Sequence, residues 1–514
     1  MTQTGVKAAP RRPILWFWAF LIALLVLCAY GIALGIALAC AFIALAALGN
    51  LGVGSIIIGI GSGLCSAALL WSLIPRRDRF IAPGPILEPA NQPRLFAEIA
   101  KIANEFQEPV PATAYLILEA NAWVARRGGM LGVGGQRVMA VGLPLLSMMT
   151  IAEFRAVLAH EFAHYYGGDT ALGIWLRTAC EGIVRSIQGL SSESGLLNVM
   201  SRWAYVAILR WVIVTILGLY WKGFLRLTML ASRQWEYRAD ELACAVAGTG
   251  PLISGLGKIV NGGLAWPWFL GSEVVPVLNA GFCPPLADGF ARFLSAPQIA
   301  ALLPGIVQAQ LTGKKPKPLD SHPTFQQRAE RALRYAFPEP PEHNTPAIAL
   351  LDGIPALEQA AFQAALPQTK VTELKPMDWE HTGDRVWVPY WRQCVREHHA
   401  LLNTYRVADI PKALADAGSL AAKVPDPKGT LLTREQRRER AISLIWMAFL
   451  VILLDRGWAL ETRPGAMWLV QGERKVGSNN LLEQMKGRKT PGVQYDALIQ
   501  ELGIGAVPLA SANV

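Results

Sequence analysis

Two histidines and a glutamate share one short segment, "LAHEFAHYYGGD", residues 158–169. His160 and His164 are four residues apart, a spacing that puts both on one face of a helix, so their imidazole nitrogens can reach a single metal ion. Glu161 points in a neighbouring direction, where its carboxylate can hold a metal-bound water and take its proton. The spacing therefore predicts two zinc ligands and a general base.

A zinc site of this kind needs a third protein ligand and an open position for water. The segment "SRQWEYRADELAC", residues 232–244, offers Glu236 and Asp240, which are again four residues apart on one helix face. One carboxylate could bind zinc while the other orients a ligand histidine. Taken alone, this pattern is more typical of a solvated acidic helix face.

The elements that must position these residues belong to a membrane protein. The chain has 514 residues, 52% of them hydrophobic, and residues 14–75 carry no charge. That run is long enough for two spans, with a turn at 47–55, and positive charges on both flanks predict that both ends face the cytoplasm.

The seven cysteines contain no C-x-x-C pair, which fits reduced thiols. The net charge of +10 comes without any nucleic-acid-binding motif, so we expect no nucleic-acid partner.

Between the two motifs the pattern predicts helices and a small sheet. Residues 93–106 read as an amphipathic helix, residues 113–120 and 136–146 as short strands joined by a glycine-rich turn, and the chain from Thr150 as helix. We expect a membrane-associated hairpin over 170–230. Its first arm has charges at four-residue steps, which places it at the interface or against a wet interior. The second arm, 203–221, is long enough to cross, although Arg210 interrupts it.

The two motifs together resemble the membrane-bound zinc metallopeptidases that include the HtpX heat-shock protease and the CAAX prenyl proteases. The resemblance covers about residues 84–335. It implies that His160, His164 and Glu236 bind one Zn²⁺ per chain, that Glu161 is the catalytic base, and that Asp240 supports a ligand from behind. It also implies a zincin-like core of gluzincin type.

The same resemblance extends to three further segments. "DSHPTFQQRAERAL", residues 320–333, is similar to the family's H-P-x-x-x-x-R segment, so His322 becomes a candidate for stabilising the oxyanion and Arg328 an active-site or structural partner. Asn121 and Ala122 match the start of the family's edge strand, which implies that they receive the substrate. Asp169 matches an aspartate that often follows the zinc helix.

The predicted fold is mainly α with a small β-hairpin or sheet, transmembrane helices and an additional C-terminal α+β region. In that last region the apolar run 441–454 is too short to span and predicts a buried helix. The predicted parts are a cytoplasmic tail (1–13), a transmembrane hairpin (14–75), a metallopeptidase domain (84–335, with the hairpin 170–230 inserted), a proline-rich connector and helix (336–371) and a C-terminal domain without assigned role (372–514).

The leading functional hypothesis is a zinc endopeptidase of the bacterial inner membrane, with its active site on the cytoplasmic side. The expected partners are the lipid bilayer and a polypeptide substrate, which the family analogy suggests is a membrane or misfolded protein. A narrow processing protease, as in CAAX cleavage, and a catalytically inactive scaffold of the same fold are the alternatives. The oligomeric state is left open.

Overall fold

The computed structural model forms two compact units, Met1–Gly263 with Val307–Ala365 and Leu264–Ile306 with Leu366–Val514. It describes residues 13–50, 52–129, 134–166, 169–192, 196–313, 322–335, 337, 344–368, 371–424, 432–487 and 494–510. Within these ranges the side chains of 13, 14, 169–175, 177, 310–313 and 372 are not described. The domain boundaries given above stay predictions.

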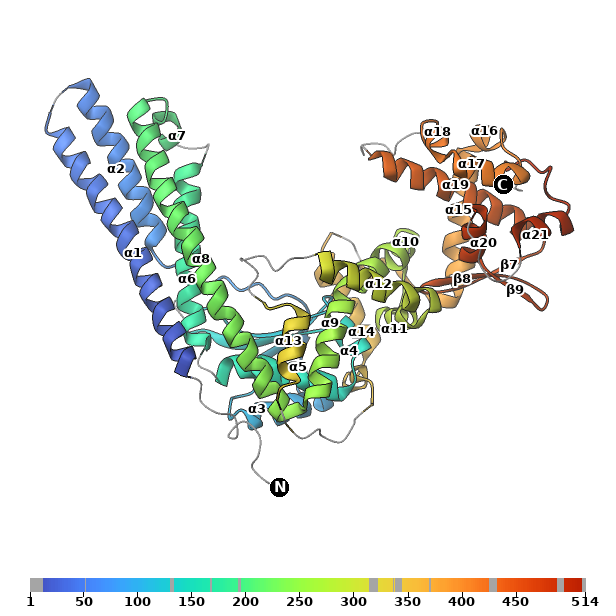
Figure 1. Cartoon of the computed structure of the whole chain (residues 1–514), viewed down its shortest axis with the longest axis horizontal. Coiled ribbons are helices and arrows are strands. Elements are labelled where there is room, and N and C mark those ends of the chain that lie inside the picture. The colour runs from blue at the N-terminus through green and yellow to red at the C-terminus, as the bar shows by residue number, and fades with distance from the viewer. Residues whose placement is uncertain are drawn as a thin grey trace. The chain divides into compact units, whose positions relative to one another are not determined.

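Long helices of the first unit pack side by side as a bundle (Figure 1): α1 (Pro13–Leu48), α2 (Val53–Leu73), α6 (Asp169–Ser191) and α8 (Ala204–Ala247). Within the described residues, α1, α2 and α8 are long and apolar enough to cross a membrane. A fourth candidate is the pair Leu286–Ser295 and Pro297–Ala309, which is bent by 79°. The structure thus confirms two helices of spanning length over 14–75, and α8 contains residues 204–221 of the arm 203–221 that was expected to be long enough to cross.

Arg210 lies on α8, in the arm that we expected to cross. Its guanidinium donates hydrogen bonds to the carbonyl oxygens of Leu190 at 2.7 Å, Ser192 at 3.2 Å and Leu197 at 3.3 Å. Leu190 and Ser192 lie at the end of α6, and Leu197 belongs to the short α7 (Leu196–Met200). Carbonyl groups at the C-terminal end of a helix have no partner in the helix and carry partial negative charge, so those of Leu190 and Ser192 compensate the arginine. Arg210 therefore stabilises the connection between α6 and α8.

A four-stranded sheet forms the base of the soluble part of the first unit. Its order is β1 (Ile86–Leu87), β2 (Thr113–Ile117), β4 (Gln136–Gly142), β3 (Ala122–Arg127). β2 runs parallel to β4, whereas β3 pairs with β4 as an antiparallel hairpin. β3 is therefore an edge strand of this sheet, with no further strand beside it in the part of the chain that the structure describes.

One part of the strand prediction was wrong. The expected strand 136–146 ends at Gly142, and Leu143–Met148 form helix α4. Pro144 lies in the first turn of that helix, where its missing N–H costs nothing and its fixed φ favours a helical start. A Cβ on Gly142 would lie 1.9 Å from the carbonyl oxygen of Glu119, so the close chain crossing there requires glycine.

The other helices of the first unit pack around the sheet and around α5. Arg155 on α5 forms a two-pronged ion pair with Glu98 on α3, with nitrogen–oxygen distances of 2.5 and 2.8 Å. The core of α5 itself is formed by buried apolar side chains such as Phe154, Val157 and Phe162. The helices that pack around the sheet, together with α5 itself, are α3 (Pro93–Glu105), α5 (Ile151–Tyr166), α9 (Thr249–Phe269), α13 (Phe325–Ala332), the 3₁₀ turn η3 (Ala347–Leu350) and α14 (Ile354–Ala365).

The second unit combines helices with a three-stranded antiparallel sheet, as expected for an α+β region. Its core is built on α19 (Arg434–Asp455), whose residues Ala448–Leu453 are all buried, which confirms the buried helix predicted over 441–454. The strands of the sheet are β7 (Ala459–Arg463), β8 (Ala466–Gln471) and β9 (Arg474–Gly477), and β5 (Phe282–Cys283) pairs with β6 (Lys375–Pro376). The other helices are η2 (Leu270–Val274), α10 (Val275–Asn279), α11 (Leu286–Ser295), α12 (Pro297–Gly313), η4 (Val371–Glu373), η5 (Trp379–His381), η6 (Gly383–Trp387), α15 (Val388–Glu397), α16 (His399–Leu402), η7 (Val407–Asp409), α17 (Ile410–Ala415), α18 (Ala417–Ala421), α20 (Ser478–Met485) and α21 (Tyr495–Glu501).

Candidate metal centre

Helix α5 carries both histidines and begins with a capping arrangement. Glu153 accepts a hydrogen bond from the backbone N–H of Thr150 at 2.7 Å, and the Thr150 hydroxyl accepts one from the N–H of Glu153 at 3.3 Å. These reciprocal bonds satisfy N–H groups at the start of the helix. Two to three turns later, His160 and His164 present their Nε2 atoms to each other at 3.3 Å. The sequence prediction of one shared helix face is confirmed.

Helix α8 brings Glu236 to the two histidines. Its carboxylate oxygens lie 3.5 Å from His160 Nε2 and 3.6 Å from His164 Nε2. Two atoms that bind one zinc ion tetrahedrally at 2.0–2.1 Å are about 3.3 Å apart, so all three distances suit a common ion. Glu236 is 4% exposed, and its Oε2 atom is buried without a hydrogen-bond partner. A buried carboxylate oxygen without a donor is costly, and a metal ion would satisfy it.

Asp240 and Arg328 fix the orientation of the His160 ring through its Nδ1 atom. Asp240 Oδ1 lies 3.0 Å from His160 Nδ1, which leaves Nε2 facing the cluster. Arg328 binds both oxygens of Asp240, with Nε at 2.9 Å and Nη2 at 2.6 Å. Burial and the Arg328 charge lower the pKa of His160, but hydrogen bonds to Asp240 and Glu236 outweigh both and raise it to about 9. A metal ion would have to displace that proton.

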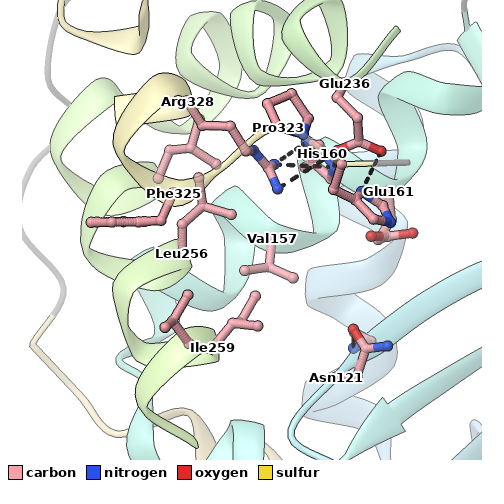
Figure 2. A pocket seen from close by; sticks show the side chains of 14 residues that line it. Asn121, Val157, His160, Glu161, Glu236, Leu256, Ile259, Pro323, Phe325 and Arg328 are labelled. Carbon is pink, nitrogen blue, oxygen red and sulfur yellow. Dashed lines mark hydrogen bonds and ion pairs between the residues drawn. The ribbon is translucent and has the colours of Figure 1, made fainter. Parts of the chain in front are cut away.

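A cavity of about 400 Å³ opens beside the cluster (Figure 2). Its polar end contains Glu161 and His322, which sequence reasoning placed in catalysis, and Arg328, next to His160 and Glu236. His322 Nδ1 lies 2.9 Å from Glu236 Oε1, and that hydrogen bond raises the pKa of His322. The predicted base and the predicted oxyanion partner thus line the same cavity as the metal cluster.

Asn121 and Ala122 also line this cavity. Ala122 begins the edge strand β3, and its N–H donates a hydrogen bond to the side-chain oxygen of Asn121 at 2.9 Å. Figure 2 shows Asn121 on the opposite side of the cavity from α9. The edge of the sheet therefore opens next to the metal cluster. The side chain of Asp169 lies outside the part of the chain that the structure describes.

Sequence reasoning missed the apolar end of the cavity. Apolar side chains from α5, α9 and α13 form this end: Val157, Leu252, Leu256, Ile259, Val260 and Phe325. Residues 252, 256 and 259 repeat at helical spacing, a signal that is typical of any core-facing helix and so does not single out a binding site.

Helix α9 is fixed to α5 by the same glutamate that caps α5. Glu153 accepts hydrogen bonds from Lys258 Nζ at 2.7 Å and from the Ser254 hydroxyl at 2.5 Å. Burial alone would raise the pKa of Glu153, but these two bonds and the one from Thr150 outweigh burial and hold the pKa below its usual value. A Cβ on Gly255 would lie 3.5 Å from Val157, so the two helices are in close contact there. The apolar wall is therefore held at a set position relative to the histidines.

Comparison with known proteins gives one match. Residues 89–336 match the model of peptidase family M48, and this range contains the three candidate ligands, Glu161 and His322. No curated protein and no solved structure matches the chain. The matched range also includes the order of elements described above, from α3 to the segment after α13. Residues 89–336 thus match peptidase family M48, the family of HtpX and the CAAX prenyl proteases, and this match supports a metallopeptidase.

Proposed function

We propose that the chain is a zinc-dependent endopeptidase in which His160, His164 and Glu236 hold one zinc ion. The observation that carries this proposal is the approach of the two Nε2 atoms to 3.3 Å from each other and to 3.5–3.6 Å from the two oxygens of Glu236, of which the buried Oε2 has no hydrogen-bond partner. When bound, zinc would act as a Lewis acid on the scissile carbonyl and on the attacking water. Asp240 and Arg328 keep the His160 ring oriented for this role.

The chain's own residues carry the proton transfers. Glu161 lies next to the ligand histidine in the same cavity, where its carboxylate takes the proton of the attacking water and then delivers it to the leaving amine nitrogen. His322 is held beside Glu236, and its imidazole N–H stabilises the negative charge that develops on the carbonyl oxygen.

The edge strand β3 gives the substrate a place to bind. Its backbone groups on the outer side can pair with an extended polypeptide, which fixes the main chain without selecting side chains. Asn121 and Ala122 lie where β3 meets the cavity, so paired substrate would pass the metal cluster. This mode of binding favours unfolded or extended segments as substrates.

Membrane attachment suggests where these substrates are found. Exposed Arg76, Arg77 and Arg79 follow α2, and positive charge beside a span favours the cytoplasmic side. The N-terminus and the active site would then face the cytoplasm of a bacterial inner membrane, and the substrates would be membrane-associated or misfolded proteins. The buried ligand geometry favours an active enzyme over an inactive scaffold of the same fold.

Metal analysis combined with two variants tests this proposal. Purified wild-type protein should contain about one zinc per chain and cleave casein. Glu161→Gln should keep the zinc and lose cleavage, because it removes only the base, whereas Glu236→Ala should lose most of the zinc. Full casein cleavage by Glu161→Gln would remove Glu161 as the base, and equal zinc content in wild type and Glu236→Ala would remove Glu236 as a ligand.

A further inference from the structure

One unbroken helix connects the membrane to the candidate metal centre. α8 has 44 residues, which corresponds to about 66 Å at 1.5 Å per residue. A hydrocarbon core is only about 30 Å thick, so a large part of α8 must lie outside it. The first half exposes apolar side chains, with Ile208, Trp211 and Leu219 more than 60% exposed. The second half carries the buried Glu236 and Asp240 and therefore belongs to the soluble part.

Charged residues on α8 show where the helix leaves the hydrocarbon. No charge occurs between Arg210 and Lys222. Lys222 and Arg226 are both exposed and lie one helical turn apart. Exposed cations are expensive in hydrocarbon and are favoured at the interface, where they can reach the lipid headgroups. The boundary of the hydrocarbon on α8 is therefore near Lys222.

The neighbouring helix α2 places the boundary of the hydrocarbon at a similar depth. Ser62 on α2 and Tyr205 on α8 are hydrogen-bonded at 2.9 Å, and Leu69 packs in one cluster with Leu217, so the two helices run in the same direction. α2 ends 11 residues after Ser62 and is followed by the exposed Arg76. Eleven residues after Tyr205, α8 is within two turns of Lys222. Two helices thus place their first exposed cation at a similar depth.

α6 and α1 agree with this boundary. Arg185 on α6 donates a hydrogen bond to the carbonyl oxygen of Ser72 at 3.3 Å, near the end of α2. On α1, the carbonyl of Leu25 accepts a hydrogen bond from the Tyr220 hydroxyl, and Trp16 and Phe20 are exposed five to nine residues before it. At 1.5 Å per residue they lie about 7–13 Å further out, in the headgroup layer where aromatic side chains are enriched.

We infer that the metal centre is held outside the hydrocarbon core at a set distance, so that it cleaves a membrane-anchored substrate only where the chain has left the bilayer by about six residues. Glu236 follows Lys222 by 14 residues, which is about 21 Å along α8, and a helix tilt of about 20° reduces this to about 20 Å. An extended polypeptide covers 3.3–3.6 Å per residue, so about six residues bridge the gap.

This inference deepens the proposed function and rests on it. It assigns the substrate class: extended segments that lie outside the bilayer, rather than transmembrane segments or residues at the bilayer surface. The site takes no part of its substrate from within the hydrocarbon, because α8 holds the candidate ligand Glu236 about 20 Å beyond Lys222.

A series of anchored substrates tests the distance. The cleavable sequence is the one that the full-length protein cleaves best in a library of soluble peptides. It is placed 2, 4, 6, 8, 12 or 20 residues after one fixed transmembrane segment, with flexible polar spacers. Each substrate is reconstituted with the full chain in phosphatidylcholine–phosphatidylglycerol vesicles, and the same peptide without an anchor is added to a parallel sample. Glu161→Gln is the control for contaminating proteases.

The expected result is a threshold. Cleavage at spacers of 2 and 4 residues should be at least 10-fold slower than at 8 and 12 residues, while the soluble peptide is cleaved in the same vesicles. Equal rates at 2 and 12 residues, with the soluble peptide cleaved, would overturn the distance inference and leave the proposed function intact. Failure to cleave any soluble peptide would overturn the proposed function, and the distance inference with it.

Discussion

Replacing Asp240 by Asn removes the charge behind the candidate ligand His160 without changing the size of the side chain. Asp240 makes three contacts, one to His160 Nδ1 at 3.0 Å and two to Arg328 at 2.6 and 2.9 Å. An amide offers one acceptor oxygen, and its NH₂ group must face a donor of His160 or Arg328. The His160 ring is then less well oriented. Loss of such a supporting group typically weakens metal binding 10- to 100-fold, about 1.4–2.7 kcal/mol.

The assay is a competitive zinc titration at pH 7.5 against a chromophoric chelator, with Asp78→Asn as the matched control. Asp78 also binds an arginine with both oxygens, at 2.8 and 3.1 Å from Arg127, but it belongs neither to the metal cluster nor to the cavity lining. Asp78→Asn should therefore change the zinc Kd less than about 2-fold. If Asp240→Asn binds zinc as tightly as wild type, or if both variants weaken binding equally, the supporting role assigned to Asp240 is wrong.

Three further outcomes follow from the structure. The apolar end of the cavity should select a large apolar substrate side chain next to the scissile bond. In peptide-library profiling, Leu256→Ala should reduce that preference at one flanking position by about 10-fold. Ile253→Ala, a change on the same helix but outside the cavity, should leave the preference unchanged. Burial raises the pKa of Glu273 to about 7, so the contribution of this carboxyl group to stability is present below its unfolded pKa and is lost as pH rises through 7. Glu273→Gln should therefore increase the free energy of unfolding at pH 8 by up to about 3 kcal/mol, seen as a higher Tm, with little effect at pH 4. A Tm difference that does not depend on pH would contradict this. Gly61→Leu should destabilise the contact of α2 with α8, because a Cβ there would lie 2.4 Å from Val206; unchanged thermal stability in detergent would refute that packing.

The ligand residues were open to prediction because their geometry is local. His160 and His164 share a helix face by spacing alone, and Glu161 follows from the same helix. The approach of Glu236, by contrast, depends on how α8 crosses α5, which no spacing within either helix encodes. Spacing offered Glu236 and Asp240 as candidates for the third ligand, and only the family resemblance, carried by residues 232–240, selected Glu236 before the structure.

Other features depend on tertiary contacts that leave no distinctive pattern in the sequence. Arg210 suggested an interrupted span, but its charge is compensated by carbonyl groups at the ends of other helices. Leu256 repeats like any core residue, and only packing shows that it lines a cavity. Pro144 did signal the end of β4, but the apolar run around it favoured a continued strand. The sequence therefore identified the chemistry better than the walls of the site.

The most direct test of the central claim is zinc K-edge X-ray absorption on the purified full-length protein. The account predicts four nitrogen and oxygen neighbours at about 2.0–2.1 Å, with the multiple-scattering signature of two imidazoles and no sulfur. Glu236→Ala should lose an oxygen neighbour or most of the zinc. A spectrum with sulfur neighbours, with fewer than two imidazoles, or with an unchanged first shell in Glu236→Ala would contradict zinc binding by His160, His164 and Glu236.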